Sequence, residues 1–522
     1  MGSGGAKLPQ RKRSGKFREG DLIMETRKTI LLKQHIGAPC QAVVEKGSIL
    51  KRGTLLAVPT GLGAPIYSPY DGIAADITDT AVIIQPADLQ SDGFEPIVPE
   101  DDTRLAAIKA AGLVGMGGAG FPTAVKLHTD LKGGYILVNA AECEPLLGHN
   151  MRQLETMTEQ TVRGVRYCME IANAKKGVFA IKAKHKEAVA ALEAALKQEP
   201  DISIHLLPDL YPMGEERAVV REVLGKLLAP TDLPSAADAV VINVETVLRA
   251  AQAIEEKRPV ITKNVTVAGK LKGGKGPHIF MDVPIGTTVG ELIERAGGID
   301  GEYGEIIMGG PFTGKPTALD APITKTTGGI LVTKPFENLN HKKTGLLVCA
   351  CGGNEARMRD LAEKMNGDVV LVQSCKQAVD VKGTLKCQNP GNCPGQAQKC
   401  LNFKKAGCEE ILIGNCSDCT NTVMGSAPKL GLKVHHQTDH VFQTMDLEVM
   451  RYLTKSKKLA QEETGETASP TPEVSDAKAS APASAAEKTT AFTSETGDGV
   501  IRIHIEEGKD INLEFRFTDF HG

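Results

Sequence analysis

The sequence contains no tryptophan, and aromatic residues make up only 4% of it. Surfaces that stack nucleic-acid bases or sugar rings need aromatic side chains, so the composition argues against both kinds of binding. A net charge of -3 removes the electrostatic case for nucleic acid. No run of about 18 apolar residues occurs, so we expect no transmembrane segment. The N-terminus also lacks the apolar core of a signal peptide, and we predict a cytoplasmic protein.

Cysteine is scarce outside one region, because nine of the twelve cysteines lie between Cys349 and Cys419. In a chain without an export signal, this clustering favours metal ligation or thiol redox chemistry over a disulfide scaffold. The length of 522 residues predicts three or four domains.

Five glycines fall within residues 112–120, directly before an expected helix. Glycine lets several backbone N–H groups converge on an anion without interference from Cβ atoms. Pro122 suits the first helical position, and Lys126 lies about one turn further on, where its ammonium could reach the same anion. The segment therefore favours a phosphate site, although a flexible loop that binds nothing remains the alternative.

Short apolar pieces between glycine and proline turns fill residues 33–80, a pattern typical of a small β-sandwich. This segment resembles the barrel-sandwich hybrid of biotinyl and lipoyl carriers. No lysine occupies a carrier-type hairpin, so we expect a structural module without an attached cofactor.

Strand and helix patterns alternate after this module, which predicts α/β organisation. Helices are expected at 101–111, with acids in its first turn, and at 151–173 and 185–197. Strands are expected at 134–138, 177–181, 202–207 and 239–246. Glu142, Cys143 and Glu144 follow the first strand, where they could face whatever the glycine segment holds. Solvated acids at a strand exit are the alternative.

Four motifs in order carry a resemblance to a known module: GLVGMGGAGFPTAVKL, VNAAECEP, YPMGEERAV and VINVETV. The set is similar to the flavin- and NADH-binding module of the complex I flavoprotein subunit and of RnfC. Where this chain has Val114 and Met116, the complex I pattern has arginines, and where this chain has Ala141, it has an acid. RnfC shares the apolar residues of this chain at these positions.

This resemblance implies an FMN cofactor with NADH stacked over it. It places the FMN phosphate on Gly115, Gly117, Gly118, Gly120 and Lys126. It places the isoalloxazine and ribityl groups near Asn139, Glu142, Glu144, Gly214, Glu215, Asn243, Glu245 and Thr246. Residues 264–297 then show a strand, turn, strand, helix pattern that resembles the β-grasp SLBB domain of the same families.

RnfC would next carry two ferredoxin-type cysteine runs, and these are missing. Instead, expected strands end at Cys349 and Cys351, at Cys375, and at Cys416 with Cys419. A fourth is expected to close with His435 and His436. If the strands are parallel with right-handed crossovers, these side chains collect at one edge of a sheet.

The Cys416-x-x-Cys419 pair stands between an expected strand and helix, where a helix N-terminus favours a thiolate. One thiol could attack and the other resolve. A competing interpretation is an iron–sulfur cluster that uses these two with Cys387, Cys393 and Cys400, and inert buried cysteines are a third. Cys408 is expected to be packed, and the two histidines to be solvated or in the core.

A flavin half followed by this cysteine region resembles the PrdC family, electron-transfer proteins associated with D-proline reductase, over about residues 20–450. The resemblance implies electron delivery from NADH to a partner reductase. From their positions at the strand ends, we predict that the catalytic cysteines are Cys416, Cys419, Cys349, Cys351 and Cys375. A homo-oligomer stays open. The alternatives are a non-catalytic adaptor on a degenerate flavin fold and an iron–sulfur Rnf-type subunit of a membrane complex.

The predicted fold class is multidomain α/β. Residues 455–498 are too poor in large apolar residues to fold and are predicted to be a disordered linker. Residues 499–522 alternate as two strands around a turn, a hairpin that should dock on this chain or on a partner. The predicted domains are a basic tail (1–20), a barrel-sandwich hybrid (21–98), an FMN/NADH-binding α/β domain (99–258), a β-grasp domain (259–340), a cysteine-rich α/β domain (341–454), the linker and the hairpin.

Overall fold

The computed structural model describes residues 27–351, 353–414 and 416–453, together with three short strands between 494 and 516. The first 469 residues form one unit, and residues 470–522 form a second that is described by itself. The predicted basic tail and most of the predicted linker lie outside the described residues. None of the described helices is long and apolar enough to cross a membrane.

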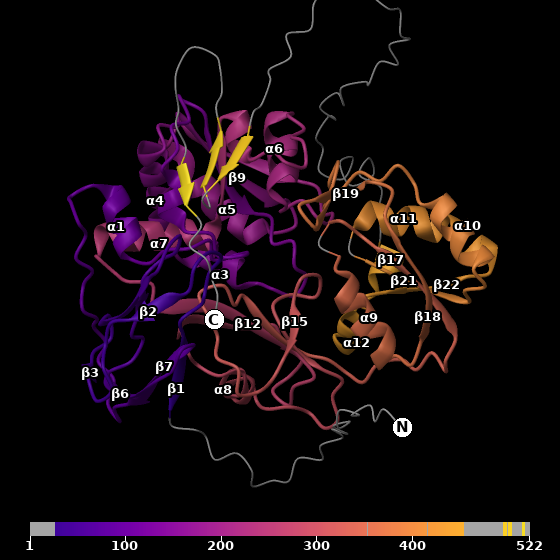
Figure 1. The fold of residues 1–522 in the computed structure, drawn as a ribbon, viewed down its shortest axis with the longest axis horizontal. Coiled ribbons are helices and arrows are strands. Elements are labelled where there is room, and N and C mark those ends of the chain that lie inside the picture. Colours follow the sequence, from indigo (N-terminus) through magenta and orange to yellow (C-terminus); the bar gives the residue numbers. More distant parts are fainter. Residues whose placement is uncertain are drawn as a thin grey trace, which may run out of the picture. The chain divides into compact units, whose positions relative to one another are not determined.

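The first module consists of two small antiparallel sheets, shown in indigo in Figure 1. Apolar side chains from both sheets, including Ile30, Leu56, Ile66 and Val82, share one core, as expected for a β-sandwich. Its strands are β1 (Lys28–Leu31), β2 (Cys40–Ala42), β3 (Ile49–Leu50), β4 (Leu55–Pro59), β5 (Ile66–Tyr67), β6 (Gly72–Ile77) and β7 (Ala81–Pro86).

A four-stranded parallel sheet follows in the order β10-β9-β8-β11. The strands are β8 (Tyr135–Ala140), β9 (Lys176–Lys182), β10 (Ile202–Leu207) and β11 (Ala239–Asn243). The chain adds β9 and β10 on one side of β8 and then crosses back to place β11 on the other. The strand order therefore reverses between β8 and β11, and such a switch point is where open α/β sheets bind ligands.

Helices cover both faces of this sheet (Figure 1). Along β8, Ile136 and Val138 pack with α4 and α7 in one core, whereas Leu137 packs with α6 in another. The helices are α1 (Arg104–Ala110), α2 (Thr123–Leu127), α3 (His149–Thr156), α4 (Thr158–Ile171), α5 (Lys186–Ala195), α6 (Glu216–Leu224) and α7 (Val244–Glu255), with 3₁₀ turns η1 (Leu196–Gln198) and η2 (Pro234–Ala237).

Three local predictions in this region were wrong. The expected helix at 151–173 is two helices that break at Met157. The helix expected from 101 begins at Arg104, because the Thr103 hydroxyl caps it by accepting from Ala106 N, and its first turn contains no acid. The strand expected to run to 246 ends at Asn243, because the Asn243 side chain starts α7 by accepting from the next helical N–H groups.

The third sheet has the order β13-β12-β16-β14-β15 and packs on one helix, α8 (Val289–Arg295). Its strands are β12 (Thr262–Gly269), β13 (His278–Pro284), β14 (Ile306–Met308), β15 (Lys315–Thr317) and β16 (Gly329–Val332). The chain order of strand, strand and helix is as expected, and the assignment of the segment to the β-grasp class stays a prediction.

The cysteine-rich segment contains a second parallel sheet, in the order β18-β17-β21-β22, as predicted. Helix α9 packs on one face and helices α10 and α11 on the other (Figure 1). The hairpin of β19 and β20 was not expected. The elements are β17 (Lys343–Val348), α9 (Glu355–Lys364), β18 (Asp368–Ser374), β19 (Ala378–Val381), β20 (Thr384–Cys387), α10 (Ala397–Lys405), β21 (Glu410–Ile413), α11 (Ser417–Ser426), η3 (Pro428–Leu430), β22 (Lys433–His436), α12 (Asp439–Thr444) and α13 (Met450–Leu453).

The second unit contains one antiparallel sheet of three strands, β23 (Ser494–Gly497), β24 (Val500–Ile503) and β25 (Glu514–Arg516). The predicted hairpin is present as β24 and β25. The prediction of disorder up to residue 498 was wrong at its end, because β23 pairs with β24 there. Docking of the hairpin stays a prediction.

A buried lysine connects the first module to the start of the glycine segment. Lys325 is 1% exposed, and its Nζ donates to the carbonyl oxygens of Pro65 and Gly112, both at 2.7 Å. Burial lowers the pKa of Lys325 to about 7. Two carbonyl dipoles therefore hold this amino group in the interior.

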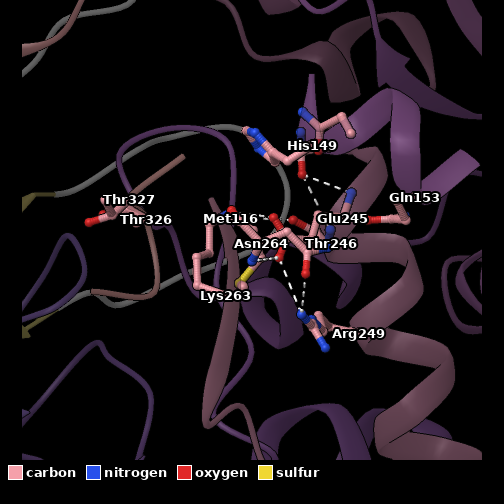
Figure 2. Close-up of polar contacts among 12 residues, drawn as sticks. Met116, His149, Gln153, Glu245, Thr246, Arg249, Lys263, Asn264, Thr326 and Thr327 are labelled. Atoms are coloured by element: carbon pink, nitrogen blue, oxygen red, sulfur yellow. Dashed lines mark hydrogen bonds and ion pairs between the residues drawn. The ribbon is translucent and has the colours of Figure 1, made fainter. Parts of the chain in front are cut away.

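A buried ion network connects α7 to β12 (Figure 2). The Glu245 carboxylate pairs with the Lys263 ammonium and with Arg249, and it accepts from Asn264 N at 3.0 Å. The side chains of Glu245, Lys263 and Arg249 are 1%, 0% and 4% exposed. Burial alone would raise the pKa of Glu245, but Lys263 and Arg249 outweigh it and hold this pKa below its ordinary value. The charges therefore compensate one another inside the protein.

We predict that Lys325→Met destabilises the protein more at pH 9 than at pH 6. Between the folded pKa of about 7 and the ordinary value of 10.5, the unfolded chain binds more protons, so the contribution of Lys325 to stability rises with pH in that window. The gap between the thermal midpoints of wild type and variant should widen on going from pH 6 to pH 9. Lys33→Met, at an exposed position, is the control. A gap that does not change with pH would contradict the prediction.

We predict that Lys263→Met lowers the free energy of unfolding by about 3–5 kcal/mol, because it leaves Glu245 buried with one cation fewer. The double variant Lys263→Met/Glu245→Gln removes both charges and should recover part of this loss. Exposed Lys272→Met serves as the control. Denaturant unfolding measures all three, and a loss below about 1 kcal/mol for Lys263→Met would show that the pair is not buried as described.

Candidate functional site

The glycine segment is a loop closed at its base and open at its tip. Gly115 N donates to Phe121 O at 2.9 Å, and Thr123 N donates to Leu113 O at 3.0 Å. The tip, residues 117–119, is exposed. Its three backbone N–H groups donate to no acceptor in the part of the chain that the structure describes. The tip therefore presents a row of free donors.

The N-terminus of α7 supports this loop from below. Met116 N donates to the Thr246 hydroxyl at 2.9 Å, a contact drawn in Figure 2. A Cβ at Gly117 would lie 2.5 Å from Asn243 Nδ2, so only glycine lets the loop approach the Asn243 amide this closely. The positive end of the helix dipole and the free N–H groups thus lie together, an arrangement that attracts an anion.

The end of β8 is tied to the turn before α6. Asn139 Nδ2 donates to Gly214 O at 2.8 Å, and Gly214 N donates to Cys143 Sγ at 2.8 Å. The structure thus brings together Asn139 and Gly214, which two separate motifs predicted for one site. Glu215 caps α6 by accepting from Ala218 N. Pro122, expected at the first helical position, is the N-cap, and α2 begins at Thr123.

Two of the residues that were predicted to bind the cofactor form ion pairs with other side chains. Lys126 pairs with Glu216 at the start of α6. Glu245 belongs to the buried network beneath α7, with both carboxylate oxygens in use. The structure does not bring either charged group to the exposed tip of the glycine loop, and their contact with a cofactor stays a prediction.

The two acids after β8, Glu142 and Glu144, are half-buried in the segment that follows the strand and are not fully solvated. Burial, with a smaller effect of Glu144, raises the pKa of Glu142 to about 8, although Asn150 Nδ2 donates to it at 2.9 Å. Glu142 is therefore mostly protonated at neutral pH. Burial also raises the pKa of Glu144, which accepts from Phe312 N at 2.7 Å and Thr313 N at 2.9 Å.

Tyr211 connects this edge to the cysteine-rich sheet. Its backbone N donates to Ser417 Oγ at 2.9 Å, and Ser417 N donates back to Tyr211 O at 3.2 Å. Its ring packs on Phe312 with centroids 4.1 Å apart. Cys143 packs against the same apolar cluster as the cysteines of the second parallel sheet. The two strand edges therefore share one buried core.

Four cysteines form a buried group at the carboxyl edge of the second parallel sheet, which we call the inner thiol group: Cys349, Cys351, Cys387 and Cys416. Thiol hydrogen bonds from Cys351 and Cys416 hold the pKa of Cys349 well below its ordinary value. Cys351 also contacts Cys387, and that contact lowers the pKa of Cys387. The predicted convergence of strand-end cysteines is thus present for Cys349, Cys351 and Cys416, and Cys387 joins them from the end of β20.

Contacts from α6 of the first parallel sheet fix the group, in addition to those from its own sheet. Arg217 of α6 donates from Nη1 to Cys387 O at 2.8 Å and from Nε to Glu215 at 2.9 Å. Arg221 donates to Asn389 Oδ1 at 2.6 Å. One helix of the first parallel sheet therefore holds the end of β20, where Cys387 lies, and the turn that follows it.

The predicted cysteine pairings need correction. Cys416 and Cys419 stand at the start of α11, but Cys416 contacts the inner thiol group whereas Cys419 contacts Cys393. Cys375 lies at the edge outside these contacts, and burial raises its pKa to about 11. Cys408 is buried as expected.

Cys387, Cys393 and Cys400 have different partners in this structure, and their use as ligands of one cluster stays a hypothesis. Cys387 contacts Cys351, Cys393 contacts Cys419, and Cys400 accepts from Ser426 Oγ at 3.4 Å. No three His, Cys, Asp or Glu side chains within the described residues are arranged to hold a metal ion. His435 and His436 are core residues, at 1% and 2% exposed.

The sequence patterns did not identify Tyr211, Phe312, Ser417 and Arg217 as the residues that join the two edges. Tyr211 and Arg217 lie within the third motif, which marked this segment as part of the site. The motif did not indicate which residues of the second parallel sheet they contact. Ser417 is 206 residues from Tyr211 in the chain, and no local pattern reports such a contact.

Comparison with known families and proteins agrees with this architecture. Residues 2–98 match the family described as the RnfC barrel sandwich hybrid domain, and residues 108–252 match the Nuo51 FMN-binding domain. These matches confirm the predicted barrel-sandwich and FMN-binding domains.

Two curated relatives are similar over much of the chain. Cobalamin reductase PduS of Salmonella typhimurium is 35% identical over 316 residues, which cover 60% of this chain and 65% of that protein. The second is a component of the proton-translocating ferredoxin:NAD(+) oxidoreductase complex of Clostridium ljungdahlii. This Clostridium relative is 34% identical over 340 residues, 61% of this chain and 73% of its own length. This chain thus spans about two thirds of each.

A crystal structure of an NAD+-reducing [NiFe]-hydrogenase aligns with 24% identity and a TM-score of 0.38, over 44% of this chain and 46% of that one. That likeness is too weak to support an inference. The similarity to the Clostridium relative covers the larger part of that protein, and both domain matches fall in the order that the sequence predicted. The chain therefore belongs to the RnfC-like family, with an RnfC barrel-sandwich hybrid followed by an FMN-binding domain of the Nuo51 type.

Proposed function

We propose that this chain is an electron-transfer flavoprotein that passes reducing equivalents from NADH through FMN to cysteine thiols and then to a partner reductase. The observation that carries the proposal is the shared core of the two strand edges. Tyr211, next to the predicted flavin site, and Cys143, at the end of β8, pack in one apolar cluster with the inner thiol group. A buried contact between the two sites shortens the distance that electrons would have to cross.

The residues at the switch point fit FMN. The free N–H groups of residues 117–119, the Asn243 amide beside Gly117 and the start of α7 suit its phosphate. The residues that would hold the phosphate are Gly115, Gly117, Gly118 and Gly120. The edge formed by Asn139, Glu142 and Gly214 would face the ring system. When bound, FMN accepts a hydride from NADH and releases electrons singly or in pairs.

The chain's own side chains prepare this edge. Protonated Glu142 can donate a hydrogen bond at neutral pH, because burial raises its pKa to about 8. Glu144 holds the backbone at Phe312 and Thr313, which places the Phe312 ring against Tyr211. Tyr211 is buried, and its ring excludes water between the two edges.

Donor and partner are finer parts of the proposal. NADH as donor is supported by the four motifs and by the name of the Clostridium complex, a ferredoxin:NAD(+) oxidoreductase. The resemblance to the PrdC family supports D-proline reductase as the partner. A cysteine-rich α/β sheet stands where RnfC carries its ferredoxin-type cysteine runs. This difference fits a protein partner that accepts electrons from thiols. We also propose that the segment from β12 to β16 is the β-grasp SLBB domain.

We predict that Gly118→Ala weakens FMN binding about tenfold, or ~1.4 kcal/mol. A Cβ at Gly118 would meet no protein atom within 4 Å, so the fold should tolerate it, but the methyl group enters the space in front of the free N–H groups. Gly93→Ala, which also has open space but lies outside the loop, is the matched control. Fluorescence quenching of FMN on titration with flavin-free protein measures Kd. Equal Kd values for the two variants would remove the loop from the phosphate site.

We predict that NADH releases at least two titratable thiols per chain from air-oxidised, FMN-loaded protein under anaerobic conditions. The inner thiol group holds the reducing equivalents, so Cys416→Ser should lose this release. Cys168→Ala, a buried cysteine in the core of the first parallel sheet, should release thiols like wild type. Thiol titration after unfolding in denaturant counts them. Bleaching of the flavin by NADH with no new thiols would contradict the proposed function.

A further inference from the structure

Only one cysteine of the second parallel sheet reaches the surface. Between residues 349 and 419, Cys393 is half-exposed and every other described cysteine is buried. A second macromolecule can therefore touch one thiol of this set. If the inner thiol group passes electrons to another protein by thiol–disulfide exchange, the exchange must therefore take place at Cys393.

Cys393 is held by a built arrangement of partners. Gln396 Nε2 donates to its Sγ at 3.2 Å, and Thr422 Oγ1 lies 3.5 Å from it. Its backbone N donates to Asp418 Oδ2 at 3.4 Å. These residues come from the turn before α10 and from the first turns of α11, so the thiol is fixed between two helices.

Cys419 completes a pair with Cys393. It is 4% exposed on the first turn of α11, and its thiol donates to the Cys393 sulfur. That hydrogen bond lowers the pKa of Cys393 to about 6, and the same contact raises the pKa of Cys419 well above its ordinary value. At neutral pH the exposed member is a thiolate and the buried member a thiol, which are the states that a nucleophile and a resolving cysteine need.

The pair also adjoins the inner thiol group. Cys416 lies three residues before Cys419 at the start of α11, and both belong to one apolar cluster. Cys393 packs against that cluster from outside. The thiols therefore run from the buried Cys416 and Cys419 to the half-exposed Cys393.

We propose that Cys393 and Cys419 form the outer pair through which this chain reduces a disulfide of a partner protein, with Cys393 as the attacking thiolate and Cys419 as the resolving thiol. This inference rests on the proposed function and names the partner's reacting group. It departs from the CxxC interpretation of the sequence, because the resolving cysteine on α11 pairs with a cysteine in the turn before α10 and not with Cys416.

The exchange balances in two steps. The Cys393 thiolate attacks one sulfur of the partner disulfide, which forms a mixed disulfide and releases the other partner sulfur as a thiolate. Cys419, after losing its proton to that thiolate, attacks Cys393 and releases the second partner sulfur as a thiolate, which takes up from solvent the proton that Cys393 lost when it ionised. The partner gains two electrons and two protons, and the outer pair becomes a disulfide. NADH is the reductant that returns the pair to two thiols.

The test uses the full chain, which is first reduced chemically, then freed of reductant and kept anaerobic without NADH. Insulin serves as the protein disulfide, and oxidised glutathione serves as the small-molecule disulfide. Wild type should form an internal Cys393–Cys419 disulfide. Cys419→Ser keeps a hydroxyl donor beside Cys393 and should trap a mixed disulfide with insulin at Cys393, found by peptide mass spectrometry. Cys408→Ser, at a packed cysteine outside the pair, should behave as wild type.

A second readout follows the pH dependence of Cys393. In wild type and Cys419→Ser, alkylation of Cys393 by iodoacetamide should reach half its maximal rate near pH 6. Cys419→Ala removes the donor, so the profile should shift upward, and the rate at pH 7 should fall about tenfold for a pKa rise of about two units. Cys393→Ser, a change at a half-exposed position with little risk to the fold, should abolish the insulin adduct.

The proposal is overturned if the mixed disulfide maps to another cysteine, if only glutathione and no protein disulfide reacts, or if Cys419→Ala leaves the alkylation profile unchanged. Since neither NADH nor flavin is present, these results are independent of the electron path from NADH. Failure of the outer pair and failure of the proposed function are thus distinguishable.

Discussion

The reciprocal hydrogen bonds between Tyr211 and Ser417 are the contact on which the rest of the arrangement depends. Each parallel sheet gathers polar or thiol groups at its own carboxyl edge, a general property of such sheets. The two edges can form one electron path, however, only if contacts between the two sheets hold the edges face to face. The Tyr211 backbone in the turn before α6 and the Ser417 backbone and hydroxyl at the start of α11 do this directly. Arg217 and the Tyr211–Phe312 ring contact add to it.

Buried charges, together with the apolar packing of Leu113 and Met116, set the position of the glycine loop. Lys325 holds its first residue, Gly112, and the Glu245 network anchors the helix whose first turn supports Met116. Both devices are costly in isolation, because a charge in the interior loses its hydration. They are tolerated because each charged group has close partners. A loop built from glycines has few side-chain contacts of its own, so its shape must come from such neighbours.

The sequence predicts well what is local. Apolar runs with β-branched residues located the strands of both parallel sheets, and the ordered motifs located the flavin domain. Prediction fails where side chains choose distant or competing partners. The strand pattern extends to Thr246, although the Asn243 side chain begins a helix at the next residue. The Cys416-x-x-Cys419 spacing predicts a pair, yet the side chains of a first helical turn diverge and find Cys349 and Cys393 instead. Those partners come from other elements, so only the fold reveals them.

The burial of all but one thiol in the second parallel sheet has a consequence for damage as well as for transfer. Peroxide and dioxygen oxidise exposed thiolates first, and progression to sulfinic acid is irreversible for most proteins. Here the exposed sulfur has a resolving neighbour that can capture a sulfenic acid as a disulfide before further oxidation. The inner sulfurs are shielded by the packing around them. The same geometry that gives one protein access to the electrons therefore insulates the store from small oxidants.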